Sequence, residues 1–198
     1  MTSRKAITML GACLLTSGCL SAAQAQSTST AVPTTGAKPV VNSSGSMCAN
    51  PDQVVFSCPL ANGKKKVSIC AAGDVRHGAG RFYYAYGHVG APDLVYPAQG
   101  QNVADPFART HLLYGGATGG QAYSFVNGQY KYIVYAISGT GTDSGGVIVQ
   151  RTADGHVLAD MKCQQGKVTQ TDDDSLIDAT LKWKSDSDIH LHGLPRAH

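Results

Sequence analysis

The chain contains no glutamate, so all 13 of its acidic residues are aspartate. Glutamate favours helix interiors, whereas aspartate favours turns and helix caps. Together with 23 glycines and nine tyrosines among 198 residues, this absence predicts an all-β protein. It also means that any carboxylate chemistry would have to use aspartate.

Excess positive charge is also lacking, because 16 lysines and arginines face 13 acids. A nucleic-acid-binding protein needs a concentrated basic surface, so we expect no nucleic-acid partner. The one basic run, Lys64-Lys65-Lys66, lies beside a predicted turn and is typical of a solvated loop.

Only one long apolar run is present, from Ala6 to Leu20, and it is too short to span a bilayer comfortably. It follows Arg4 and Lys5 and precedes Ala23-Gln-Ala25, which predicts a secretory signal peptide over 1–25. Alternatively, the segment ending at Cys19 resembles the lipobox of bacterial lipoproteins, which would place the mature N-terminus on a membrane. We therefore expect a periplasmic or secreted protein, or an outer-membrane lipoprotein if Cys19 is lipidated.

Composition divides the rest of the chain into three parts. Residues 26–47 are rich in Ser, Thr, Pro and Gly and nearly free of charge, which predicts a flexible leader. We expect one disulfide-stabilised β domain over 48–184 and a loose C-terminal tail over 185–198.

Four cysteines remain outside the signal: Cys48, Cys58, Cys70 and Cys163. An even number in an exported chain indicates two disulfides, and the three possible connectivities stay open. Proximity favours Cys58 with Cys70, which leaves Cys48 with Cys163. No pair has the Cys-x-x-Cys spacing of a zinc site.

Turn signals between runs of strand character predict three hairpins, at 62–63, 127–128 and 154–155. Around Asn127-Gly128, a type I′ turn would place Phe125 opposite Tyr130. Around Asp154-Gly155, the expected register sets Ile148 against Met161. About eight short strands in a single small antiparallel barrel or sandwich result. A short helix, 176–183, capped by residues 172–175, follows.

Two patterns could carry chemistry. Asp143-Ser144-Gly145-Gly146 resembles the nucleophile motif of chymotrypsin-like serine proteases, which implies Ser144 as nucleophile and glycine amides as oxyanion hole. No histidine lies in that family's histidine motif, and the alternative interpretation is a flexible loop over 138–146.

The second pattern is a pair of histidines, His190 and His192. On an extended strand both side chains would point to the same side, as metal ligands do, but no third ligand is evident. We expect no metal and no cofactor.

The tyrosines suggest a binding surface. Tyr and Arg recur as interface anchors, so Arg81 with Tyr84 and Tyr86, or Tyr130 with Tyr132, could form a recognition patch. The alternative is that these rings pack on sheet faces and stay half-buried.

After the export signal, Phe56-Ser-Cys58, Val67-Ser-Ile-Cys70, an aromatic strand and a late cysteine follow one another. This layout resembles small periplasmic β proteins of Gram-negative bacteria. Ser138-Gly139 after a Tyr-rich strand is similar to the inhibitory loop of the periplasmic lysozyme inhibitors. The resemblance implies a non-catalytic protein that binds and inhibits a cell-envelope enzyme, with binding residues Ser138, Gly139, Thr140 and Ser144. The alternatives are a serine hydrolase using Ser144 and a structural envelope module.

Overall fold

The computed structural model describes residues 45–196. The signal peptide, Cys19 and almost all of the leader lie outside these residues. Within 45–196, the chain forms two antiparallel sheets of five strands each and two short helices. The all-β prediction is confirmed, and the architecture is a sandwich and not a closed barrel. No helix in the described part is both long enough and apolar enough to cross a bilayer.

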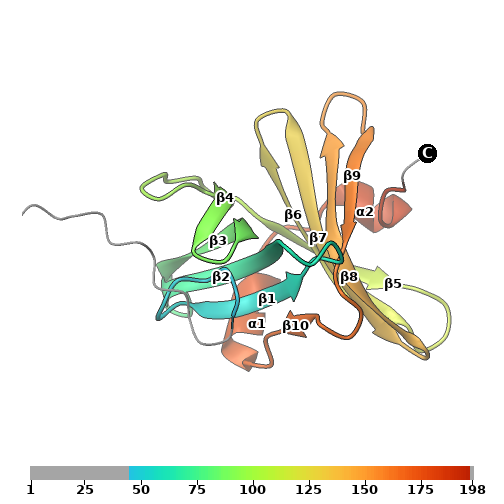
Figure 1. The fold of residues 1–198 in the computed structure, drawn as a ribbon, viewed down its shortest axis with the longest axis horizontal. Coiled ribbons are helices and arrows are strands. Elements are labelled where there is room, and N and C mark those ends of the chain that lie inside the picture. The colour runs from blue at the N-terminus through green and yellow to red at the C-terminus, as the bar shows by residue number, and fades with distance from the viewer. Residues whose placement is uncertain (1–44, 197–198) are drawn as a thin grey trace, which may run out of the picture. The chain divides into compact units, whose positions relative to one another are not determined.

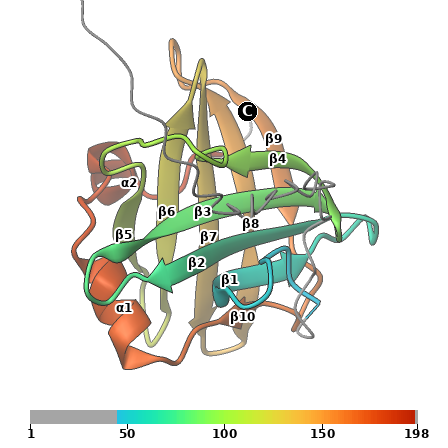
Figure 2. The same ribbon diagram turned by 90° about the vertical axis from the view of Figure 1, so that its left-hand side faces the viewer.

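Each sheet is a meander. The first has the order β10-β1-β2-β3-β4, and the second has the order β5-β6-β7-β8-β9. The strands of the first sheet are β1 (Gln53–Pro59), β2 (Lys66–Asp74), β3 (Ala79–His88), β4 (Ala91–Tyr96) and β10 (Thr169–Gln170). Those of the second are β5 (Ala108–Leu113), β6 (Gly119–Asn127), β7 (Tyr130–Gly139), β8 (Thr142–Arg151) and β9 (Val157–Lys162). Figure 2 shows the strands of the two sheets running across one another.

Aromatic rings fill the space between the sheets. Tyr84 of the first sheet is buried against Phe125 of the second, with ring centroids 4.9 Å apart. The lone tryptophan, Trp183, packs edge-on to Phe82 and stacks on Phe107. Because these rings come from both sheets and from the segment after α1, they join the layers into one core.

Helix α1 (Asp174–Leu181) begins where the sequence predicted a cap. The side chain of Asp173 accepts hydrogen bonds from the backbone N–H groups of Ser175 and Leu176. Leu176 is buried in the core, so the helix is fixed against the sandwich by its apolar face. The predicted C-terminal helix is confirmed.

The segment after Lys184 is not loose, contrary to our expectation. It forms a second helix, α2 (Ser187–His192), which packs against β5 and the outer face of the second sheet. Ile189 is only 3% exposed, in a cluster with Ile133 and Ile148. The second sheet is therefore covered on both faces, which explains the apolar residues on both sides of its strands.

The four cysteines form two disulfides, consistent with an exported protein in an oxidising compartment, but the pairing that we favoured is wrong. Cys48 pairs with Cys70, and Cys58 pairs with Cys163. Sequence proximity misleads here because β1 and β2 pair Cys58 with Val67, three residues along the strand from Cys70. Cys58 also faces the core between the sheets, whereas Cys70 belongs to the cluster on the opposite face.

The hairpins form near the predicted positions with different registers. The central turn is Gly128-Gln129, and only Gly128 has positive φ, which is the type II′ pattern and not type I′. Phe125 therefore faces Tyr132, a shift of two residues that keeps each ring on its expected face. Asn62-Gly63 lies in a longer connection between Pro59 and Lys66.

In the third hairpin, the register shifts between Val149 and Gln150 of β8. This irregularity places Val147, not Ile148, opposite Met161, and Ile148 faces Asp160. A shift of one residue exchanges the two faces of a strand. Met161 consequently packs in the core, and Asp160 lies on the outer face.

Candidate functional site

The turns of the β6–β7 and β8–β9 hairpins lie side by side at one end of the second sheet (Figure 1). Thr152 joins them, because its backbone N–H and its hydroxyl both donate to the carbonyl of Gln129, at 2.9 and 3.1 Å. In the second turn, the side chain of Arg151 pairs with Asp154 at 2.7 Å. We call this pair of turns, residues 126–130 and 151–158, the hairpin tips.

The hairpin tips carry large apolar side chains that the core does not use. Val126 is 49% exposed, Tyr130 is 42% exposed and Leu158 is 46% exposed. Folding gains little from an apolar side chain left in water, so three of them on neighbouring turns indicate a contact surface.

A cleft of about 710 Å³ lies beside the hairpin tips, between the outer side of β6 to β8, the segment before β5 and the start of α2. We call it the tip cleft. Its walls combine apolar and charged side chains, which include Val103, Pro106, Val126, Lys131, Gln150 and Asp188.

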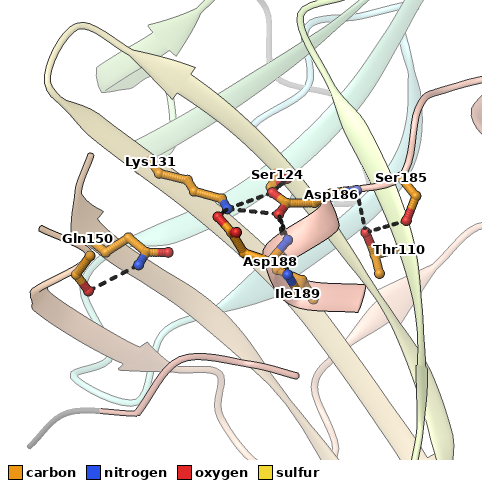
Figure 3. Close-up of polar contacts among 9 residues, drawn as sticks. Thr110, Ser124, Lys131, Gln150, Ser185, Asp186, Asp188 and Ile189 are labelled. Atoms are coloured by element: carbon orange, nitrogen blue, oxygen red, sulfur yellow. Dashed lines mark hydrogen bonds and ion pairs between the residues drawn. The ribbon is translucent and has the colours of Figure 1, made fainter. Parts of the chain in front are cut away.

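Lys131 and Asp186 form the floor of the tip cleft (Figure 3). The Lys131 ammonium lies 2.8 Å from the Asp186 carboxylate and 3.3 Å from that of Asp188. Asp186 also accepts from the Ser124 hydroxyl at 2.6 Å, and its backbone N–H donates to Thr110 Oγ1 at 2.9 Å. These polar groups find their hydrogen-bond and ion-pair partners within the chain. The network therefore anchors α2 to the sheet and does not serve as a ligand-binding site.

Burial acts to raise the pKa of Asp186, but hydrogen bonds from Lys131 and Ser124 outweigh it and hold the pKa below its usual range. The carboxylate is therefore charged at neutral pH. It also caps α2, because it accepts from the backbone N–H groups of Asp188 and Ile189.

One edge of the tip cleft is an open strand. The β5–β6 pairing ends where Ala108 faces Ser124, so β6 continues beyond its neighbour for three residues, through Asn127. In an antiparallel ladder, successive residues direct their backbone groups to opposite sides. Asn127 and Tyr130 close the hairpin, so the N–H and C=O of Val126 point away from β7, to the side on which β5 no longer pairs with β6. An extended segment from another chain could pair there.

The first predicted tyrosine patch is not formed. Tyr84 is buried in the core, and Tyr86 is half-buried with its hydroxyl 3.6 Å from Met161 Sδ. Arg81 points to the other face of β3, over the ring of Tyr83. Tyr84 and Tyr86 instead pack on the face of the sheet, as the alternative interpretation of the sequence expected.

The second predicted patch is half right. Tyr130 and Tyr132 share a face of β7, but Tyr132 is half-buried and stacks on Phe125 with ring centroids 4.9 Å apart. Tyr130 alone is accessible, and it belongs to the hairpin tips.

The predicted flexible loop over 138–146 is almost entirely strand. Ser138 and Gly139 end β7, Thr142 begins β8, and only Thr140 and Gly141 form the turn. A Cβ on Gly139 would lie 2.4 Å from Thr118 Oγ1, so glycine is required there by close packing. The flexible loop that the sequence suggested is therefore reduced to a two-residue turn.

Ser144 lies within β8, opposite Ile137, and hydrogen-bonds to no histidine in residues 45–196. Gly145 and Gly146 lie between β7 and β9, and Gly146 pairs with both strands. An oxyanion hole needs amides that face a bound substrate, and this ladder does not offer such a loop.

The metal candidates also change their setting. His190 and His192 belong to α2 and not to a strand, so residues two apart point in different directions. The described residues hold no group of three His, Cys or Asp side chains suited to a metal ion.

Sequence reasoning missed the floor and the open edge of the tip cleft. One signal was available: Lys131 alternates with Ile133, Tyr135 and Ile137, and a lysine on an apolar strand face needs an acidic partner. No family model, curated protein or solved structure matches the chain, so its function has to be inferred from its own geometry.

Proposed function

We propose that the chain is an exported, non-catalytic domain that binds another protein of the cell envelope through the hairpin tips and the tip cleft. The observation that carries this proposal is the coincidence of three exposed apolar side chains, Val126, Tyr130 and Leu158, with a cleft and an open strand edge. Protein interfaces favour such exposed aromatic and apolar anchors beside polar groups.

Rigidity supports the same proposal. The Cys58–Cys163 disulfide ties the end of β9 to the first sheet, and a continuous aromatic core packs under the strands from which the tips project. Thr152 ties one tip to the other. A preformed surface loses little conformational freedom on binding, so more of the contact energy appears as affinity.

The mode of binding that fits the cleft is strand addition. An extended partner segment would pair with the backbone of Val126, with its side chains against Val103 and the tips.

The partner that we propose is a cell-envelope enzyme, which the domain would inhibit by inserting the narrow hairpin tips into the enzyme's cleft. The domain would act in the periplasm or after secretion, or at the outer membrane if Cys19 is lipidated.

The test is a comparison of V126K with L113K in affinity capture from envelope extract. Leu113 is 80% exposed on β5 and does not line the tip cleft, so it is a matched control for adding charge to an exposed apolar position. We expect V126K to weaken capture of the partner about tenfold or more, because charge would be buried at the contact. The proposal fails if V126K and L113K capture the same proteins in the same amounts as the wild type.

A further inference from the structure

A second hollow, of about 890 Å³, lies on the outer face of β7 to β9, under the segment that follows α2. It shares no lining residue with the tip cleft. Ile137, Ile148 and Leu194 give it an apolar surface. We call it the outer-face hollow.

A glycine leaves room for the Tyr135 side chain, which lines the hollow. Gly146 lies between Tyr135 of β7 and Lys162 of β9, and a Cβ on it would lie 2.5 Å from the carbonyl oxygen of Met161 and 3.0 Å from the Tyr135 hydroxyl. The ring of Tyr135 therefore leans over Gly146, and its hydroxyl accepts a hydrogen bond from Lys162 Nζ at 2.8 Å. Lys162 also pairs with Asp160 at 2.7 Å, so its charge is largely offset.

Four further polar groups line the hollow without a partner. The side chains of Tyr114, Ser144, His192 and Arg196 form no side-chain hydrogen bond or ion pair with any residue in 45–196. Burial raises the pKa of Tyr114 above its usual value, and the positive charge of Arg196, which lines the same hollow, opposes that shift. Tyr114, His192 and Arg196 are exposed and Ser144 is half-buried, so a ligand can replace water as their partner. A mainly apolar hollow lined by a few such polar groups is the pattern of a small-molecule site.

The charge of the hollow selects the ligand. Asp160 balances Lys162, and Arg196 forms no ion pair with any residue in 45–196, so it is the cation of the hollow that no described carboxylate offsets. The hydroxyls of Tyr114, Tyr135 and Ser144 line the same hollow. A guanidinium forms its strongest hydrogen bonds with carboxylate or phosphate oxygens. The adjoining isoleucines and Leu194 suit an aliphatic or aromatic body.

We propose that the outer-face hollow binds a small organic anion, a carboxylate or phosphate carried on an apolar body, with Arg196 as its counterion. Ser144, which resembled a protease nucleophile in the sequence, would line this site and hydrogen-bond to the ligand. The site is independent of protein binding at the hairpin tips.

The experiment is calorimetric titration of the full mature chain with four probes: octanoate, octyl phosphate, octanol and inorganic phosphate. We expect octanoate, octyl phosphate or both to bind, and octanol and inorganic phosphate to bind at least about tenfold more weakly, because each lacks one of the two recognised features. Which of the two amphiphiles binds more tightly identifies the anionic group.

R196Q is the matching variant, and R81Q is its control because Arg81 is an exposed arginine on the first sheet. We expect R196Q to weaken binding of the amphiphile about tenfold, and R81Q to leave it unchanged. Binding of no probe, equal binding of octanol, binding of inorganic phosphate as tight as that of the amphiphiles, or equal affinities of R196Q and the wild type would each overturn the proposal.

Discussion

At the scale of single residues, the clearest feature is the ion pair between Lys131 and Asp186, which we did not predict from the sequence. Lys131 and Asp186 have side chains only 13% and 10% exposed, and each has its partner within the chain. Removing one member of a buried pair leaves the other charge desolvated and unpaired, which costs more than the pair itself contributes.

We therefore expect D186N to lower the free energy of unfolding by about 2 kcal/mol or more, because asparagine keeps the helix cap but not the charge. D154N is the control, since Asp154 and Arg151 form an exposed pair that water screens, so its loss should lower stability far less than D186N does. Urea unfolding followed by tryptophan fluorescence measures both. Equal losses in the two variants would mean that Asp186 is not an anchor.

Ionisation of Tyr83 limits the stability of the fold at high pH. Burial is the main cause that raises its pKa to about 12, and its hydrogen bond to the Asp52 carboxylate, 2.8 Å long, adds to the shift. A raised pKa means that stability is complete below the unfolded pKa of about 10 and is lost as pH rises through the folded value. Burial also raises the pKa of Tyr123 to about 12, which places a second loss in the same window.

The prediction is that stability falls between about pH 10 and about pH 12, and that Y83F falls less steeply because it has no proton to lose there. At neutral pH, Y83F should be less stable by about 1 kcal/mol, because the hydrogen bonds to Asp52 and Ala49 are gone. Denaturant unfolding across this pH range decides. Parallel pH curves for Y83F and the wild type would assign the loss to other groups.

At the scale of elements, the sequence predicted where the chain turns better than how the strands align. Asn127-Gly128 marked the central hairpin to within one residue, because few other pairs accept positive φ. The alignment of β8 with β9 depends on the shift at Val149 and Gln150, and apolar residues on both faces removed the alternation that would have revealed it.

Helix α2 could not be predicted for a related reason. Six residues are too few to show a helical period, and such a helix is stable only through contacts with the rest of the fold. Those contacts are Ile189 under the helix and the Asp186 network at its start, and both depend on strands far away in the sequence.

Helix α2 offers an internal comparison of two apolar residues. We expect I189A to lower the free energy of unfolding by about 2 kcal/mol, because it leaves a cavity against Ile133 and Ile148. L191A should cost about 0.5 kcal/mol or less, because Leu191 is 71% exposed. If I189A unfolds at the same denaturant concentration as L191A, the helix does not pack as described.

At the scale of the whole molecule, the disulfides depend on which parts of the fold meet. Cys58 and Cys163 are 105 residues apart in sequence and join the two sheets, next to the bridge between Leu60 and Cys163. The number of cysteines predicted two bonds, but their partners follow from packing that no local pattern encodes.

Peptide mapping of the unreduced protein should find Cys48 linked to Cys70 and Cys58 linked to Cys163. By loop entropy, replacing Cys58 and Cys163 with serine should cost about 5 kcal/mol, and replacing Cys48 and Cys70 about 3 kcal/mol. A peptide containing Cys58 linked to Cys70 would contradict the fold.

In the candidate site too, residue types were predicted from the sequence, but features that depend on tertiary packing were not. Tyr130 was predicted as a contact residue from its type, and it lies at the hairpin tips. The open edge of β6 and the floor formed by Lys131 and Asp186 could not be predicted, because they arise where β5 ends and where α2 packs.

The central claim is that a partner protein binds at the hairpin tips. It is tested most directly by photo-crosslinking in living cells, with a photoreactive residue at position 126 or, as control, at position 113. We expect position 126 to give one discrete adduct with an envelope protein, and Y130A to reduce that adduct. Adducts of equal yield and identity at both positions, or none at position 126, would contradict the account.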